Sequence, residues 1–313
     1  MARPPHHVTH RMELTRGDRA AANASPAPEN PGEGPDPGPR EFARRVLHAA
    51  QIGKSSLDLD LSGTAHVTVA NLTALLKELP NLQRLSLRQT GLSALPTQIG
   101  RLADLTELHL SHNLLSELPK ELSRLGELKY LDLDTNSLDE LPAGIGALKR
   151  LRYLNASNNH LLQLGGEALA CSGLRALKVA HNRLRELPAE LGSLERLELL
   201  DLSYNRLAAA PPGLARLVAL KTLALAGNRL AFVPGSIARL QGLTSLDLSG
   251  NDLADLPAQF AALTALKRLD LSGNPMPSAP AVLSHLASLE FLSMDVMRGK
   301  PAPRPPAGPT DGC

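Results

Sequence analysis

This sequence of 313 residues contains no tryptophan, and its aromatic residues are only three tyrosines and four phenylalanines. A hydrophobic core must therefore be built from aliphatic side chains, and an aromatic residue on a predicted surface is informative. Cysteine is also scarce, because Cys171 and Cys313 are the two that the chain holds. Two distant cysteines cannot form a disulfide framework, which favours a reducing, cytoplasmic compartment.

The chain also carries little net charge and has no long hydrophobic run. Lys and Arg number 33 against 31 Asp and Glu, so no large field attracts nucleic acid or anionic lipid. No apolar run reaches the roughly 18 residues of a membrane helix, and the N-terminus lacks the apolar segment of a Sec signal peptide. We therefore expect a soluble protein with neither nucleic-acid nor membrane partners.

The dominant feature that is present is a repeat of 23 residues, which fills the chain from Leu82 to Ser288 in nine copies without insertion or deletion. Residues 128–150, LKYLDLDTNSLDELPAGIGALKR, show the pattern LxxLxLxxNxLxxLPxxIxxLxx. A fixed period of this length predicts a solenoid, in which each unit buries its apolar face against the next. The leucines at the first, fourth and sixth positions should face inward from a short strand, and the later apolar positions should close the layer.

Asparagine occupies the ninth position, where the chain leaves the strand and its backbone groups need new partners. A buried asparagine amide can satisfy these groups in an adjacent turn. The ninth-position residues are Asn113, Asn136, Asn159, Asn182, Asn205, Asn228, Asn251 and Asn274. Proline follows leucine at Leu95, Leu118, Leu141, Leu187 and Leu256, which predicts the start of an irregular or short-helical return segment.

The flanking segments divide the chain further. Residues 1–40 form a Pro/Gly-rich tail that we expect to be disordered; an uncleaved export signal of the type III kind is the alternative. Residues 41–81 are expected to form an N-terminal cap, with an amphipathic helix at 41–52 and a degenerate first repeat at 54–81. Residues 82–288 carry the nine repeats, residues 289–297 supply a closing strand, and residues 298–313 return to a proline-rich tail.

The units LTELHLSHNLLSELPKELSRLGE and LERLELLDLSYNRLAAAPPGLARLVA resemble the LxxLPxxIxxL class of leucine-rich repeat, which occurs in Ras-group scaffold proteins and in effectors of Gram-negative pathogens. The resemblance implies an α/β horseshoe with a parallel sheet on its concave face and an irregular convex side. It also implies that the concave strands bind a protein. Several bacterial relatives append a catalytic domain, for which the 16 residues after Met297 are too few.

Signatures of catalysis are absent from the sequence. It has no GxxxxGK[ST] phosphate loop, no GxSxG elbow and no CxxC pair. Neighbouring histidines and aspartates occur on adjacent predicted strands, but His181 lies about 14 Å from His112 at the spacing of strands, so no ligand set converges. Lys178 and Asp201 are expected to form a surface ion pair, and Cys171 to face the core. We therefore predict no enzyme activity, metal or cofactor.

The candidate binding residues are the outward positions of repeats two to six. They are His109, His112, Tyr130, Asp132, Asp134, Tyr153, Asn155, Asn158, Lys178, His181, Leu199 and Tyr204. All three tyrosines are in this set, whereas repeats seven to nine present mostly small side chains. Tyrosine favours interfaces, although its strand propensity is an alternative explanation. Tyr130 and Tyr153 should form one patch, with Tyr204 near its far edge.

These observations predict a monomeric, non-enzymatic adaptor, scaffold or inhibitor that binds a protein partner on its concave face. The alternative is a bacterial effector that is delivered into a host cell without a Sec signal and acts on a host protein.

Overall fold

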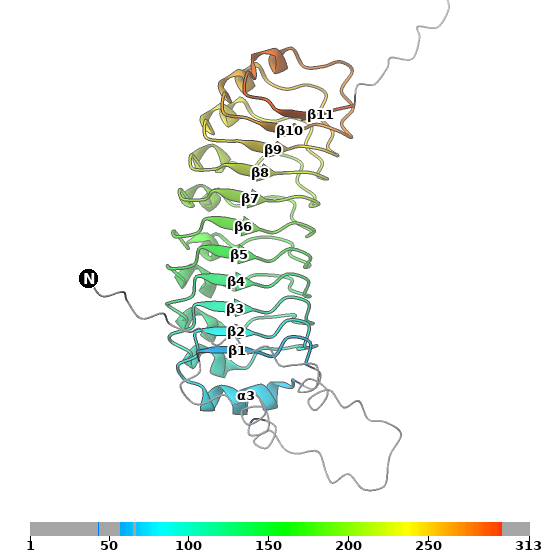
Figure 1. The fold of residues 1–313 in the computed structure, drawn as a ribbon. Helices are drawn as coiled ribbons and strands as arrows, with labels where there is room; N and C mark the ends of the chain where they lie inside the picture. The colour runs from blue at the N-terminus through cyan, green and yellow to red at the C-terminus, as the bar shows by residue number, and fades with distance from the viewer. Residues whose placement is uncertain (1–42, 44–56, 65–66, 296–313) are drawn as a thin grey trace, which may run out of the picture.

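A computed structural model describes residue 43 and residues 57–64 and 67–295, which form one elongated coil (Figure 1). The predicted tails, the last two residues of the predicted closing strand, and all of the predicted helix at 41–52 except Ala43 lie outside the described residues. In the described part, no helix is long and apolar enough to cross a membrane.

One parallel sheet of 11 strands runs the length of the coil, and the strands follow each other in chain order. Each strand has three residues, and its central leucine pairs in register with the central leucine of the next strand, as Leu108 does with Leu131. The strands are β1 (Asp58–Asp60), β2 (Arg84–Ser86), β3 (Glu107–His109), β4 (Tyr130–Asp132), β5 (Tyr153–Asn155), β6 (Ala176–Lys178), β7 (Leu199–Asp201), β8 (Thr222–Ala224), β9 (Ser245–Asp247), β10 (Arg268–Asp270) and β11 (Phe291–Ser293).

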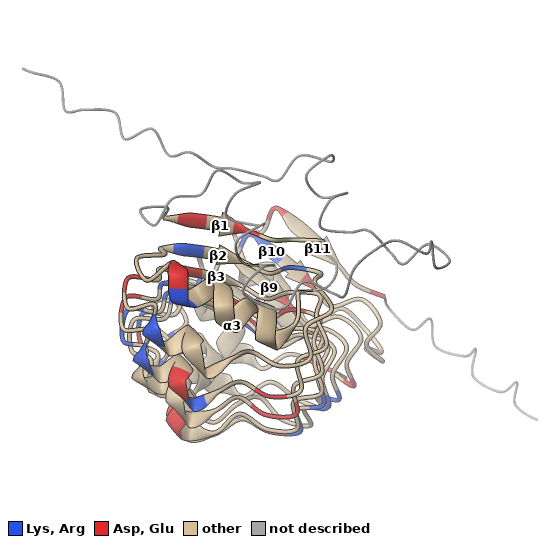
Figure 2. Cartoon of the chain, turned by 90° about the horizontal axis from the view of Figure 1, so that it is seen from below, with Lys and Arg blue, Asp and Glu red and all other residues tan. Residues whose placement is uncertain are grey.

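Short 3₁₀ helices form the opposite side of the coil, as the view along its axis shows (Figure 2). They are η1 (Thr97–Arg101), η2 (Lys120–Arg124), η3 (Ala143–Ala147), η4 (Gly166–Leu169), η5 (Ala189–Ser193), η6 (Leu214–Arg216), η7 (Gly235–Arg239), η8 (Ala258–Ala262) and η9 (Ala281–His285). Pro96, Pro119 and Pro142 precede the first three in an extended conformation. The predicted solenoid with an irregular to short-helical convex side is confirmed.

The N-terminal end is covered by the one α-helix longer than a turn in the described part, α3 (Val69–Glu78). Its first turn is capped by Thr68, whose hydroxyl accepts a hydrogen bond from the Asn71 amide at 3.1 Å, a common N-cap arrangement. Leu72, Leu75 and Leu76 face the core, as their helical spacing predicts. Leu59 and Leu61 are buried in the first repeat, whereas Leu57 precedes β1 and is exposed.

The asparagine ladder satisfies the turn backbone, as predicted. The Asn182 side-chain amide donates to the carbonyl oxygens of Val179 in its own repeat and of Ala156 in the preceding one, at 3.1 and 3.0 Å. Its Oδ1 accepts from the Leu161 amide at 3.0 Å. Each asparagine therefore joins two successive turns. In the first repeat, Thr90 takes this place and donates its hydroxyl to Asn113 at 3.0 Å.

Leucines fill the core continuously from β1 to β10, and most of them have no exposed surface. The predicted closing strand is present as β11, although it is shorter than expected. Phe291 and Leu292 of β11 are more than two-fifths exposed, because no later strand in the described residues covers them.

Candidate functional site

The strands place the 12 predicted binding residues in four columns on the concave face and its exit edge, where the chain leaves the strands. The third-position column holds Tyr130, Tyr153 and Leu199, and the fifth-position column holds His109, Asp132, Asn155 and Lys178. The seventh position contributes Asp134, and the eighth-position column holds His112, Asn158, His181 and Tyr204. Third and fifth positions lie in the strands, whereas seventh and eighth positions follow the strand ends.

Three ring side chains form a stack in the centre of this surface, which we call the aromatic ladder: His109, Tyr130 and Tyr153. The two tyrosine rings are parallel, with centroids 4.4 Å apart and an interplanar angle of 1°. The His109 ring lies 4.7 Å from Tyr130 at an angle of 36°. Lys178 continues the row, with its Nζ 5.8 Å from the Tyr153 centroid. The predicted Tyr130–Tyr153 patch is therefore confirmed.

Burial shifts the pKa values of two residues of the aromatic ladder, Tyr130 and His109. Desolvation, reinforced by the nearby Asp132 carboxylate, raises the pKa of Tyr130, so its hydroxyl keeps its proton. Burial also lowers the pKa of His109, although Asp132 and Glu107 act in the opposite direction. The His109 Nδ1 atom is buried without a hydrogen-bond partner, which is consistent with a neutral imidazole. Tyr130 and His109 thus present uncharged rings, and the Lys178 ammonium adds a positive charge beside the row.

The fifth-position acid and amide have a structural role that the repeat pattern did not reveal. Asp132 Oδ1 accepts hydrogen bonds from the Asp134 amide at 3.2 Å and from Asn155 Nδ2 at 3.1 Å. Asn155 Oδ1 accepts from the Ser157 amide at 3.1 Å in the same way. Asp132 is only 3% exposed, so the expectation that it faces solvent is wrong. Neighbouring side chains cover it, and it stabilises the strand end.

Arg88 is a neighbour of this cluster that the sequence reasoning missed, because the comparison of outward positions left out repeat one, to which Arg88 belongs. Its Nη2 lies 3.7 Å from Asp132 Oδ2, and its Nε donates to Ser111 Oγ at 2.8 Å. The contact with Asp132 gives the buried carboxylate a counter-charge and leaves half of the Arg88 side chain exposed.

The eighth-position residues share a left-handed backbone conformation. Positive φ angles occur at Gln89, His112, Thr135, Asn158, His181 and Tyr204, and at Gly227, Gly250 and Gly273 in the last three repeats. Asp134 links three of them: its carboxylate accepts from Asn158 Nδ2 at 2.9 Å and from Thr135 Oγ1 at 3.0 Å, and lies 3.9 Å from His112 Nε2. The exit edge of repeats two to four is thus a connected polar row.

Tyr204 was predicted to lie near the far edge of the Tyr130–Tyr153 patch. Its ring belongs instead to a second stack. Its ring is parallel to that of His181 within 11°, with centroids 4.3 Å apart. On its other side it overhangs Gly227, where a Cβ would lie 2.6 Å from Tyr204 Cδ1. The prediction failed because Tyr204 is an eighth-position residue, whose ring projects from the turn and not from a strand. Tyr204 remains 54% exposed.

Two further expectations concern single residues. Lys178 and Asp201 are register partners, but among the described residues no ion pair joins them, so that prediction is wrong. The Lys178 ammonium lies over Tyr153 instead.

Cys171 faces the core as predicted, and burial raises the pKa of its thiol. A buried protonated thiol is a poor nucleophile. Leu199 is half-buried between Ala176 and Thr222 of the flanking strands.

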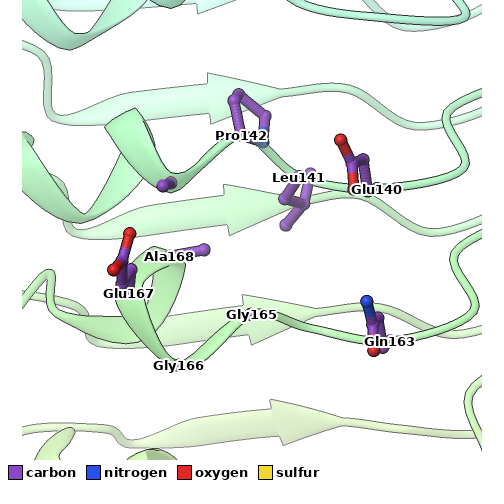
Figure 3. A pocket seen from close by; sticks show the side chains of 9 residues that line it. Glu140, Leu141, Pro142, Gln163, Gly165, Gly166, Glu167 and Ala168 are labelled. Atoms are coloured by element: carbon purple, nitrogen blue, oxygen red, sulfur yellow. The ribbon is translucent and has the colours of Figure 1, made fainter.

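A shallow depression of about 280 Å³ lies outside this surface, between the return segments of repeats three and four (Figure 3). It exists where Gly165 replaces the proline of the repeat. Its lining residues are Glu140, Leu141, Pro142, Ala143, Gln163, Gly165, Gly166, Glu167 and Ala168. None of them is a nucleophile paired with a base, and the described residues contain no His, Cys, Asp or Glu group that could hold a metal.

Comparisons with known proteins agree with the geometry. The family described as leucine-rich repeat region matches residues 57–164, and the family described as leucine rich repeat matches residues 149–207 and 218–276. No curated protein matches the chain.

Solved structures with similar folds include bacterial and plant proteins. A leucine-rich repeat protein of Leptospira interrogans is 26% identical, with 77% of this chain and 79% of that chain covered and a TM-score of 0.53. An internalin of Listeria monocytogenes is 20% identical over 82% of this chain and 81% of its own, with a TM-score of 0.63. The plant peptide hormone receptor RGFR1, solved in complex with RGF2, is 25% identical over 78% of this chain, with a TM-score of 0.59. This chain spans 48% of that receptor.

Proposed function

Because this chain is a leucine-rich repeat protein, we propose that it is a non-enzymatic interaction module that binds a protein partner on its concave face. The proposal centres on repeats two to six. It describes an adaptor, scaffold or inhibitor that acts as a monomer in the cytoplasm and needs no cofactor.

The aromatic ladder is the observation that carries the proposal. Burial of the leucine core and the asparagine ladder account for the fold, and neither requires tyrosine at the third position. The equivalent residues of β8 and β9 are Thr222 and Ser245. Stacked tyrosines offer a rigid apolar surface with two hydroxyl groups, and such residues commonly dominate binding energy at protein interfaces.

Other residues of the predicted set complete a surface of the usual composition, with an aromatic centre and a polar rim. Lys178 and His109 flank the tyrosines, and Leu199 adds an apolar side chain on β7. The exit edge contributes His112, Asp134, Asn158, His181 and Tyr204. Asp132 and Asn155 support this surface from within, because their oxygens hold the strand ends. The similarity to RGFR1, which was solved with the bound peptide RGF2, is consistent with a polypeptide ligand.

Affinity capture with the full chain as bait, followed by mass spectrometry, would test this proposal. Two baits should be compared in parallel, the parent and a variant that combines Tyr130→Ala with Tyr153→Ala. We expect a protein that the parent retains and the variant loses. Recovery of the same proteins by both baits would contradict the assignment of the aromatic ladder.

A bacterial effector acting on a host protein is a second candidate function, favoured by the Pro/Gly-rich residues 1–40, which lack the apolar segment of a Sec signal. In that case, residues 1–40 would serve as the export signal. Fusing residues 1–40 to a reporter and measuring its type III export would decide between the two candidates. Export of the fusion would favour the effector, and retention would favour the cytoplasmic adaptor.

A further inference from the structure

Three arginines occupy the tenth position of consecutive repeats: Arg183, Arg206 and Arg229. We call this column the arginine stripe. All three side chains are exposed. Their backbone amides donate to the carbonyls of Leu161, Leu184 and Leu207 in the preceding turns, at 2.9, 2.8 and 2.9 Å. The backbone of the stripe is therefore fixed at every step, and within the described part of the chain its guanidinium groups have no hydrogen-bond partner.

Charges at the second position of the repeat are neutralised by residues one repeat away. At the second position, Arg175 and Lys221 both bind Glu198, with N to O distances of 3.1 and 2.7 Å. Lys267 pairs with Glu290 at 2.8 Å in the same column. The stripe differs, because no carboxylate among the described residues lies within ion-pair distance of its three guanidinium groups.

The residues around the stripe do not compensate for its charge. In the tenth-position column, His160 precedes the stripe and Asp252 follows it in repeat eight. Asp252 and Arg229 both lie in the described part of the chain, and no ion pair joins them. Arg185 adds a further positive charge in repeat five, and Glu186 is the acid that follows it in the chain. The exit edge of repeats five to seven is therefore locally basic in a chain whose formal net charge is only +2.

The fold does not require arginine at this position. Other repeats carry Leu114, Ser137 and Asp252 there, with the same backbone hydrogen bond to the preceding turn at 2.8, 2.9 and 3.0 Å. Like charges at roughly the 4.8 Å spacing of adjacent strands repel each other. A column that repels itself and has no role in packing is well suited to bind an anionic group.

The stripe also adjoins the proposed binding surface. His181 and Tyr204, which form the second stack, precede Arg183 and Arg206 by two residues in the same turns. An interface that includes the exposed Tyr204 ring would bring the stripe close to the same partner.

We propose that the arginine stripe binds an acidic face of an α-helix in the protein partner, an inference that rests on the proposed function. Carboxylates at i, i+4 and i+7 of a helix span about 10.5 Å along its axis. Three arginines on successive turns span about 9.6 Å. Carboxylates at i, i+2 and i+4 of an extended strand would span about 13 Å, which matches less well. Arginine suits this role because its planar guanidinium binds carboxylates with two hydrogen bonds.

A synthetic probe can test the stripe without the natural partner. The probe is a fluorescent alanine-based peptide with glutamates at i, i+4, i+7 and i+11, and its binding to the full chain is followed by anisotropy at low salt. The stripe variant carries Arg183→Gln, Arg206→Gln and Arg229→Gln. The matched control carries Arg101→Gln, Arg124→Gln and Arg239→Gln, which remove the same charge from exposed positions on the convex side.

We expect the stripe variant to bind the peptide about tenfold more weakly than the parent, and the control to stay within about twofold. A peptide of the same composition with glutamates spread around the helix should bind the parent more weakly. Circular dichroism melts confirm that both variants fold.

Equal loss in the two variants, no binding by the parent, or equal binding of both peptides would overturn the proposal. Tighter, stripe-dependent binding of a short single-stranded oligodeoxynucleotide would also overturn it, in favour of a nucleic-acid ligand. Such failures would leave the aromatic ladder untouched, because that assignment is tested by the Tyr130 and Tyr153 substitutions against the captured protein.

Discussion

At the scale of single residues, the eighth position of the repeat is the most constrained. Its backbone is left-handed in all nine repeats, with φ between 52° and 68°. Glycine adopts this conformation freely, and other residues pay for it in free energy, Thr135 more than most because it is β-branched. Six repeats nevertheless keep a side chain there. Strained residues are often retained at functional sites, which supports a binding role for the exit edge.

Two glycine substitutions measure that conformational cost. At Gly250, with φ of 60°, an added Cβ would meet only Gly227 atoms at 3.5 Å, so Gly250→Ala should lose about 1–2 kcal/mol of unfolding free energy through backbone strain alone. Gly126 has open space and no positive φ, so Gly126→Ala should be neutral or gain up to about 1 kcal/mol. Urea titrations compare the two, and equal midpoints would refute the strain.

His109 should make stability depend on pH. Burial lowers its folded-state pKa below the ordinary value near 6.5, so the unfolded chain binds the proton more readily. Its contribution to stability is therefore fully present above pH 6.5 and is lost as the pH falls through the folded-state pKa.

The urea midpoint of the parent should consequently drop more between pH 7.5 and 5.5 than that of His109→Gln. The difference between the two proteins should stay constant from pH 7.5 to 8.5. A parent that parallels the variant over the acidic range would show that His109 is not desolvated in the folded protein.

At the scale of the repeat, the asparagine ladder replaces the hydrogen bonds that the short strands cannot supply. Asn182→Ala would leave the Leu161 amide and the Ala156 carbonyl without this side-chain partner in a buried layer. We expect a loss of about 1–3 kcal/mol of unfolding free energy. Arg183→Ala, at the neighbouring exposed position, should change it by less than about 0.5 kcal/mol. Denaturant titration distinguishes the two outcomes, and similar losses would contradict the ladder's role.

The repeat unit was predictable because its residues obey simple requirements. Leucine at the first, fourth and sixth positions can only face inward, and an asparagine after each strand implies unpaired backbone groups. The fifth-position oxygens were not predictable in this way. Asp132 occupies an outward strand position, which suggests a solvated carboxylate. Only the structure shows that this carboxylate accepts a hydrogen bond from the Asp134 amide and so stabilises the turn.

At the scale of the whole molecule, the sequence predicted the positions of the candidate residues along the sheet better than the way in which their side chains group. The strand register alone placed Tyr130 beside Tyr153. The stacking of Tyr204 on His181 was not predicted, because both side chains leave a left-handed turn whose direction strand geometry does not give. The arginine stripe escaped because the comparison of columns stopped at the eighth position, although Arg183, Arg206 and Arg229 are equally periodic in the sequence.

The most direct test of the account is a calorimetric titration of the captured partner into three full-length proteins. These are the parent, the Tyr130→Ala and Tyr153→Ala double variant, and a control with Thr222→Ala and Ser245→Ala in the same column on β8 and β9. Stacking of the two rings contributes about 0.5–1.5 kcal/mol to stability beyond the area that they bury, and thermal melts check that both variants fold. The account predicts that the tyrosine variant binds at least about 2 kcal/mol more weakly, about 30-fold, while the control binds like the parent. Parent-like affinity in the tyrosine variant would contradict it.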